Sequence, residues 1–374
     1  MLRTARTIVL GAALSGVLIS ACAKDSGEDT FLQPDLDASP KDAPSADQTA
    51  PDAAPEAAPD VQTGDVIIVD VSPSDASPEG DALVYAHDNT KMYSVDPKDP
   101  KLAVTEIGPF DCIGGTGNDS SMTDIAVDKD GKLFGVSETS IFLDMKIEGS
   151  SVKCKSTQVP IDAGNNTEAK FFGLTFAPPT AELGTEETLI GANSNGDLYK
   201  IDRNSGKITL VGNFGKVPSV DGQGHEYDPD HVGKNWELSG DIVFLTNQGG
   251  TPVGFATVRD CPNPPESYNC SKIDTLVEID ISKLKATSSG GTPPIVTKAI
   301  RGQVLPEGCT QTSCAFGSMY GIAAWKDKVY GFARDGKLLT IDNNTGEGTL
   351  IAATPHSFAG AGVTTLAPVI PPVK

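Results

Sequence analysis

The sequence predicts an all-β fold made of five copies of a four-stranded antiparallel unit. In each copy, aliphatic and polar residues alternate over a short stretch that ends at an acidic residue and a polar turn, a pattern typical of a hairpin with one buried face. The five stretches are residues 92–96, 144–148, 199–202, 276–280 and 338–342. The content of 39 Gly and 27 Pro in 374 residues also favours many short strands joined by turns.

Each copy supplies further strands on both sides of this stretch. The strand before it is expected at residues 83–87, 133–137, 189–193, 253–258 and 329–334, and the strand after it at residues 103–107, 152–159, 208–211, 295–299 and 349–353. The acidic residue recurs at intervals of 52 to 78 residues, so the copies differ mainly by loop insertion.

An innermost strand is expected before four of the copies, at residues 124–127, 173–176, 241–244 and 321–324. The fifth such strand lies near the C-terminus, at residues 362–366. Pairing it with residues 83–87 would complete a fifth unit from both ends of the chain and leave no sheet edge free. This closure resembles the β-propeller family. The resemblance implies a five-bladed propeller over residues 81–374, with six blades as the alternative if the long insertions contain further strands.

The N-terminus has the layout of an export signal. Two arginines precede an apolar run that is too short to span a bilayer, and small residues follow it. The sequence Ile19-Ser-Ala-Cys22 resembles the lipobox of bacterial lipoproteins, which implies that residues 1–21 are removed and that Cys22 carries the lipid. By the same resemblance, Ala23 favours the outer membrane, with exposure at the cell surface as a further option. Acyl chains on Cys22 would give a stable membrane anchor.

Residues 22–80 are predicted to form a disordered tether. They are dominated by Ala, Pro and Asp and offer almost nothing to bury. The formal net charge of the chain is −21. Nucleic-acid binding requires a basic surface, so no nucleic acid is expected as a partner. We expect a monomer whose partners are the membrane, through the anchor, and a carbohydrate or protein ligand.

Six cysteines remain after Cys22, and an even number in an exported chain favours disulfides. A zinc site is the alternative, but the spacings contain no Cys-x-x-Cys pair. We therefore expect neither a metal nor a cofactor. Nearest-neighbour pairing predicts three bridges, Cys112–Cys154, Cys261–Cys270 and Cys309–Cys314.

Most of the long loops are expected on one face of the ring, with residues 178–187 and 281–293 as exceptions on the opposite face. In four-stranded antiparallel blades, the loops that join second to third strands and those that join successive blades open on the same side. These include residues 212–238, 260–274 and 301–318, and long structured loops on a rigid scaffold commonly hold binding sites. Tyr227 and Trp236 are expected to form an apolar platform there for a carbohydrate or a peptide. The candidate ligand-binding residues are Tyr227, Asp228, Asp230, His231, Trp236, Glu237 and His356.

The sequence also contains residues that resemble parts of a transition-metal site and of calcium-binding loops. His225, Asp228, Asp230 and His231 are side chains that bind transition metals, but their irregular spacing lacks the pattern of a helical ligand pair. The turns at residues 128–131 and 193–197 resemble parts of a calcium loop but fail its full ligand spacing, and hairpin turns explain them better.

An enzymatic alternative rests on Asp124 and Asp241, which begin two of the innermost strands. Five-bladed glycosidases use acids around the axial channel, so the resemblance implies a hydrolase acting on polysaccharide or a small ester as the alternative function. The structural interpretation, that these side chains cap backbone N–H groups of the next blade, is favoured. The sequence thus predicts an exported, lipid-anchored binding module, with a hydrolase or a structural envelope protein as alternatives.

Overall fold

The computed structural model describes residues 84–116, 118–162, 170–245, 252–262, 269–288, 290–309, 312–326 and 328–365. The predicted signal, Cys22 and the tether lie outside the described residues. Within these ranges, no helix has the length and apolar character needed to cross a bilayer.

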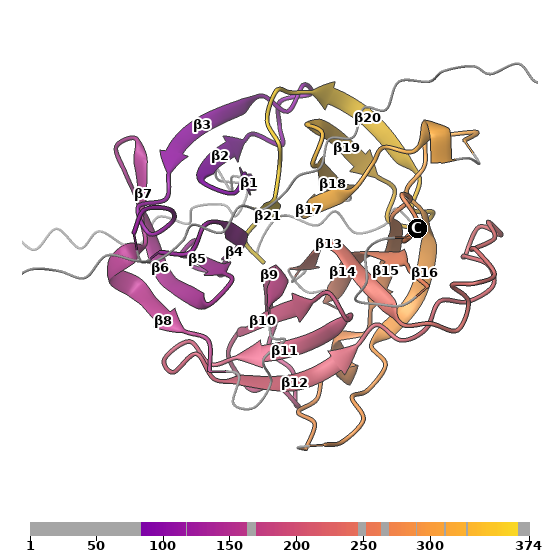
Figure 1. Ribbon diagram of the computed structural model, residues 1–374, viewed down its shortest axis with the longest axis horizontal. Helices are drawn as coiled ribbons and strands as arrows, with labels where there is room; N and C mark the ends of the chain where they lie inside the picture. The colour runs from indigo at the N-terminus through magenta and orange to yellow at the C-terminus, as the bar shows by residue number, and fades with distance from the viewer. Residues whose placement is uncertain are drawn as a thin grey trace, which may run out of the picture. The chain divides into compact units, whose positions relative to one another are not determined.

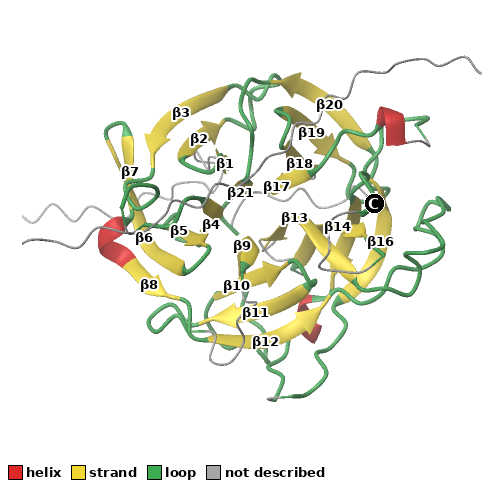
Figure 2. Cartoon of the chain, viewed as in Figure 1, coloured by secondary structure: helices red, strands yellow, loops and turns green. Residues whose placement is uncertain are grey.

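The described strands form five antiparallel sheets, arranged as the blades of a ring (Figures 1 and 2). The first four blades follow chain order, and the fifth combines both ends of the chain. The first blade contains β4 (Met122–Val127), β5 (Leu133–Ser137), β6 (Ser140–Glu148), β7 (Ser151–Lys153) and β8 (Gln158–Pro160); the second β9 (Phe171–Ala177), β10 (Thr188–Asn193), β11 (Asp197–Ile201) and β12 (Ile208–Asn213); the third β13 (Trp236–Leu245), β14 (Val253–Asp260), β15 (Thr275–Ile279) and β16 (Thr297–Gln303); the fourth β17 (Met319–Trp325), β18 (Lys328–Ala333), β19 (Lys337–Ile341) and β20 (Gly348–Ala353); and the fifth β21 (Gly360–Gly362), β1 (Val84–His87), β2 (Lys91–Val95) and β3 (Val104–Pro109).

The ring closes as predicted, although the closing strand begins two residues earlier than expected. The inner strands contact one another in the order β4, β9, β13, β17, β21 and back to β4. β21 pairs antiparallel with β1, with Gly360 opposite His87. The strand was expected at residues 362–366, but space favours the glycine at position 360, because a Cβ atom there would lie 2.2 Å from Asp124 Oδ1. The five-bladed β-propeller predicted from the repeats is therefore confirmed.

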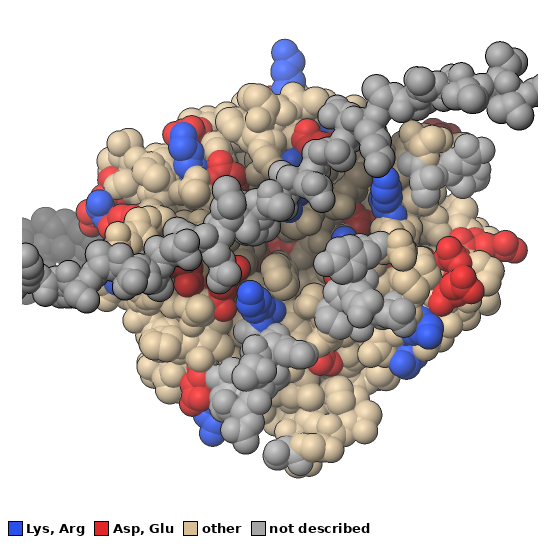
Figure 3. Space-filling model, viewed as in Figure 1, with Lys and Arg blue, Asp and Glu red and all other residues tan. Residues whose placement is uncertain are grey.

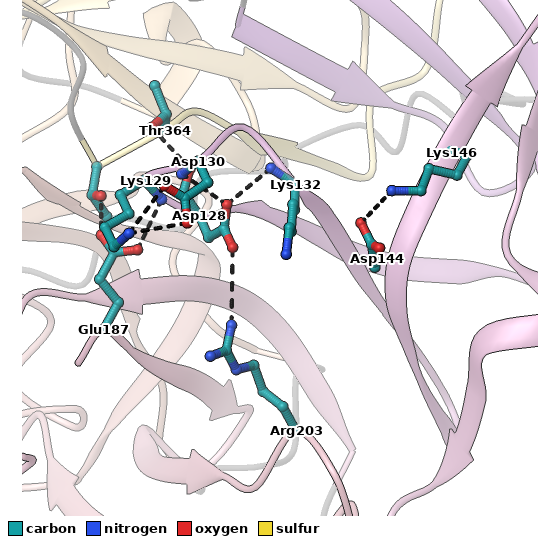
Figure 4. A network of polar contacts seen from close by, with 10 residues as sticks. Asp128, Lys129, Asp130, Lys132, Asp144, Lys146, Glu187, Arg203 and Thr364 are labelled. Atoms are coloured by element: carbon teal, nitrogen blue, oxygen red, sulfur yellow. Dashed lines mark hydrogen bonds and ion pairs between the residues drawn. The ribbon is translucent and has the colours of Figure 1, made fainter. Parts of the chain in front are cut away.

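After β21, the chain is fixed to the first and second blades by the network in Figure 4. Thr364 forms a parallel bridge with Val127, and its hydroxyl donates to the carbonyl of Asp128 at 2.9 Å. The hydroxyl of Thr365 donates to the carboxylate of Glu187 in the second blade. Glu187 also accepts from the backbone N–H of Lys129 at 2.8 Å. The C-terminal segment therefore holds two blades besides the one it completes.

The apolar core lies between neighbouring blades. Phe134 of the first blade and Phe176 of the second pack edge to face, with ring centroids 4.9 Å apart. The guanidinium of Arg203 lies 5.6 Å from the centroid of each ring, a distance typical of cation–π contacts. Similar clusters join the other blades. The blades are thus rigid wedges whose apolar faces are covered by the next wedge.

The three predicted disulfides are present, and one of them explains an error in the predicted strands. The strand expected at residues 152–159 is interrupted by the 3-10 helix η1 (Lys155–Thr157). Cys154 is bridged to Cys112, and its backbone N–H and that of Lys155 donate to Asp111 Oδ1 at 2.8 and 3.0 Å. These contacts turn the chain away from the regular ladder, so β7 and β8 pair separately with β6. The other two short helices are η2 (Ile281–Lys283) and η3 (Thr312–Cys314).

Deleting residues 360–374 should abolish cooperative thermal unfolding and cause aggregation, because β1 and β17 would lose the strand that joins them. Circular dichroism melting and light scattering measure both effects. A chain that ends after Thr365 keeps every contact described here and is the matched control. A melting curve that the longer deletion leaves unchanged would show that β21 does not close the ring.

Candidate ligand site at the channel mouth

Five equivalent residues, one from each inner strand, meet around the axis of the ring. They are Asp124, Gly173, Asp241, Gly321 and Gly360. A Cβ atom on Gly321 would lie 2.6 Å from the carbonyl carbon of Gly360, and one on Gly173 would lie 3.5 Å from the Cα of Asp241. Three of the five positions thus lack a side chain where neighbouring blades approach most closely. This arrangement leaves room for the two carboxyl groups.

The two carboxyl groups are buried and cap the neighbouring blades. Asp124 accepts from the backbone N–H of Leu174, and Asp241 accepts from that of Ile322 at 3.4 Å. The carboxyl groups also contact each other, and both residues are 0% exposed. The capping role that the sequence favoured is confirmed. Because the pair has no access to solvent, it offers no carboxylate to a substrate. Asp124 and Asp241 therefore no longer support the comparison with glycosidases.

His87 of the fifth blade completes this buried polar centre. Its Nδ1 donates to the carbonyl of Asp88 at 2.8 Å, which leaves Nε2 as an acceptor 3.5 Å from Asp124 Oδ1. Burial lowers the pKa of His87 to about 4, so the ring is neutral at physiological pH. Burial raises the pKa of both Asp124 and Asp241 well above the ordinary range, and the repulsion between the two groups adds to this rise for Asp241. Asp124 and Asp241 therefore favour a state in which one proton is shared between their carboxyl groups.

Asp241→Asn should make the melting temperature less dependent on pH. The pKa of the pair is raised in the folded state, so its contribution to stability is complete below about pH 3.9 and is lost as pH rises through the raised values. A neutral amide of the same shape does not lose a proton. Thermal melting from about pH 4 to about pH 9 measures the difference, with exposed Asp228→Asn as the control for removing a charge. If Asp241→Asn and wild type fall in parallel with rising pH, the pair does not share a proton.

Each of these axial positions is directly preceded by one residue, and four of the five preceding residues line one cavity, whose opening we call the channel mouth. The five preceding residues are Thr123, Phe172, Gly240, Tyr320 and Ala359. The pairing of β9 with β10 skips Phe172, and that of β17 with β18 skips Tyr320. In β13, the register moves from Leu238 to Ile242, so the intervening residues have no partner in β14. Such bulges redirect side chains out of the ladder. Here the bulges place Phe172 and Tyr320 at the channel mouth.

A cavity of about 270 Å3 opens at this mouth. Four of the five mouth residues line it, so the walls come from the inner strands of the second, third and fourth blades and from the residue before β21. The loops that join blades enter here, which places the cavity on the face that carries the long loops. Figure 3 shows a hollow over the middle of the ring with acidic side chains beside it. The lining residues are Phe172, Ser194, Glu237, Leu238, Ser239, Gly240, Arg259, Tyr320 and Ala359.

An ion pair forms one wall of the cavity. Arg259 Nη2 donates to Glu237 Oε1 at 2.8 Å, and the two side chains are 17% and 3% exposed. The other carboxylate oxygen lies 2.8 Å from Cys261 Sγ and 3.2 Å from Cys270 Sγ, so the disulfide packs against it. Burial raises the pKa of Glu237, and Arg259 partly opposes this rise. The disulfide and the ion pair together fix the end of β14.

The insertion between β12 and β13, residues 214–235, caps the third blade. Two bridges, Lys216 with Asn235 and Val220 with Glu226, give it an internal hairpin-like structure. Its polar side chains are tied to the ends of three strands of that blade. The contacts are Asp221 Oδ2 with the N–H of Gln303 at 2.9 Å, the hydroxyls of Tyr227 and Thr275 at 3.1 Å, and His231 Nδ1 with Asp260 Oδ2 at 2.7 Å.

The structure corrects the role expected of Tyr227 and Trp236. Tyr227 is 5% exposed and Trp236 1%, and the two rings pack edge to face at 5.3 Å. They attach the insertion to the core and do not form an exposed platform. The sequence shows that aromatic residues lie in a loop, but not that the loop folds back and buries them.

The other candidate residues are divided among different places. Asp228 and His231 line a second cavity of about 420 Å3, while Asp230 is exposed. Glu237 lines the cavity at the channel mouth. His356 packs against Tyr93 of the fifth blade, with ring centroids 4.5 Å apart, and does not line that cavity.

The four residues weighed as transition-metal ligands do not all meet at one place, although Asp228 and His231 line the same cavity. His225 pairs with Asp221 at 2.9 Å and lines a cavity of about 350 Å3, whereas His231 lines the second cavity. Among the described residues, two groups of three metal-type side chains lie close together, and both contain bridged cysteines. A sulfur that is already bonded to another sulfur is not a thiolate ligand.

Eight of the nine residues that line this cavity were missed by the sequence analysis, among them all of its aromatic and polar side chains except Glu237: Phe172, Ser194, Ser239, Arg259 and Tyr320. A signal for two of them was present, because Phe172 and Tyr320 directly precede the recurring Asp or Gly of the inner strand. If the residue before the recurring Asp or Gly had also been compared among the repeats, both aromatic residues would have been predicted to lie at the channel mouth. Ser194 and Arg259 occur in ordinary strand and loop contexts and carry no such signal.

The ring defines the class of protein, a five-bladed β-propeller. No family model matches the chain, and no curated protein matches it.

Comparison with solved structures finds, among others, a Bacteroides caccae protein of unknown function, at 9% identity and a TM-score of 0.36, covering 76% of this chain and 99% of the other. A Bacteroides thetaiotaomicron protein of unknown function has 15% identity and a TM-score of 0.33, covering 67% of this chain and 53% of the other. PorZ, an essential bacterial surface component of the type-IX secretion system of Porphyromonas gingivalis, has 15% identity and a TM-score of 0.29; 74% of this chain matches 27% of PorZ. The fold assignment rests on the strand pairing described above.

Proposed function

We propose that the protein is an exported, lipid-anchored binding module whose ligand site is the channel mouth of the propeller. The observation that carries the binding role is the cavity of about 270 Å3, in which bulged residues of several blades meet a buried ion pair. A concave site with apolar walls and a few fixed polar groups is the usual form of a ligand site. The carbohydrate or protein ligand expected from the sequence would enter there.

Export and anchoring are supported by two independent features. Three disulfides form in the ring, and such bonds persist in oxidising compartments. The lipobox-like Ile19-Ser-Ala-Cys22 supplies an acylation site at Cys22, the first residue of the expected tether. This tether, residues 22–80, would hold the propeller away from the membrane. The outer membrane remains the expected location.

Cys22→Ser should release the protein from the membrane fraction or leave it unprocessed, because the thiol that would carry the lipid is gone. Fractionation after a salt wash, followed by mass spectrometry of the N-terminus, measures both outcomes. Cys112→Ser is unsuitable as a control because it breaks a disulfide, so Ser20→Ala is used. A Cys22→Ser protein that is processed and stays with membranes would disprove this anchor.

Tyr320→Ala should reduce binding to whatever glycan or peptide the full mature chain captures from mixed arrays. Tyr320 lines the cavity, and its ring is held by Arg334, whose guanidinium lies 5.1 Å from the ring centroid. The control is Ile147→Ala, which truncates a side chain that is 42% exposed on the first blade. Failure of wild type to bind either array, or equal binding by Tyr320→Ala, would argue against a ligand site at the mouth.

A further inference from the structure

We infer that the channel-mouth cavity takes the terminal ring of an uncharged sugar chain. This inference rests on the proposed binding role and adds to it the chemical class of the ligand. Size is the first reason. A volume of about 270 Å3 is just below the usual range of small-molecule sites, which begins at about 300 Å3, so it suits one ring-sized group with the rest of the chain outside.

The polar wall offers both kinds of hydrogen-bonding group that a sugar hydroxyl uses. Arg259 supplies only donors, while the carboxylate of Glu237 supplies only acceptors, and the two are held 2.8 Å apart. The hydroxyl of Ser194 lines the same cavity and can act either way, whereas that of Ser239 donates its hydrogen to Asp274 and is left as an acceptor. Neighbouring hydroxyls on a ring both donate and accept, so they match this mixed wall better than a purely anionic or purely cationic group does.

The charge of Arg259 is already balanced, which argues against an acidic ligand. Glu237 pairs with it directly. Asp274 is a second carboxyl group close enough for Arg259 to lower its pKa, although burial dominates and raises that pKa to about 6. Asp274 also accepts from the hydroxyl of Ser239 and, at 2.6 Å, from the N–H of Met319. At neutral pH these acids offset the guanidinium, so a ligand carboxylate would meet repulsion as well as attraction.

An exposed aromatic ring supplies the apolar part of the site. Phe172 is 39% exposed, although it belongs to an inner strand whose other residues are largely buried. It lines the cavity together with Tyr320. Aromatic rings have an electron-rich face, and the C–H face of a sugar ring is the electropositive surface that fits it. The bulge in β9 therefore presents Phe172 where a ring seated against Arg259 and Glu237 can pack.

The test compares matched ligands by isothermal titration calorimetry on the full mature chain. The probes are the methyl glycosides of glucose, galactose, mannose and N-acetylglucosamine, short oligomers ending in each, the corresponding uronic acids, and an acetylated tripeptide with a free carboxylate. At least one uncharged sugar should bind, and its uronic acid should bind about tenfold more weakly or not at all. Phe172→Ala should weaken the sugar about tenfold, while Ile147→Ala, equally exposed on another blade, should leave it unchanged.

The outcomes separate this inference from the binding role itself. Preference for the uronic acids or for the tripeptide, lost on Tyr320→Ala, would overturn the sugar assignment and keep the channel mouth as the ligand site. Sugar binding that survives both Phe172→Ala and Tyr320→Ala would place the sugar elsewhere and overturn the inference. Absence of binding to every sugar probe would also overturn it, and the mixed arrays would then decide on the binding role. Melting curves of both variants must match wild type for the comparison to count.

Discussion

The contact between the carboxyl groups of Asp124 and Asp241 is the interaction on which the ring depends. Each group belongs to a different blade, and each also accepts a backbone N–H from the blade that follows its own. Asp124 accepts as well from Ala361 in the closing strand. Two side chains therefore join inner strands of all five blades at one buried point. A propeller has no strand that crosses its axis. The hydrogen bonds of this polar centre therefore hold the inner strands together at the middle of the ring.

This centre constrains everything around it. Two buried like charges are costly, so the pair favours a shared proton, and the neutral ring of His87 lies beside it. The three glycines at equivalent positions are then required for space, because a Cβ atom on Gly360 would overlap the carboxylate of Asp124. The residues directly before four of these axial positions line the cavity at the channel mouth. The candidate site is thus a consequence of how the blades meet.

Much of this architecture could be predicted from the sequence, because strand alternation and the position of acids and turns are local properties. The repeats, the closure from both ends and the cysteine pairing follow from spacing alone. The position of β21 does not, because the repeat pattern placed the strand at residues 362–366 while packing against Asp124 requires the glycine at position 360. The burial of Tyr227 and Trp236 depends on where a long insertion folds back, and the cavity depends on bulges that residue type does not reveal.

The bulges also separate two properties that are usually coupled in a β-sheet. Residues within a ladder alternate between faces, so changing one alters both pairing and packing. Phe172 and Tyr320 are skipped by the ladder, and their side chains belong to the mouth alone. Such positions can be replaced one at a time without moving a strand. The propeller thus offers a small set of independent candidate recognition positions on a fixed frame, a starting point from which new specificities could evolve or be engineered by single substitutions.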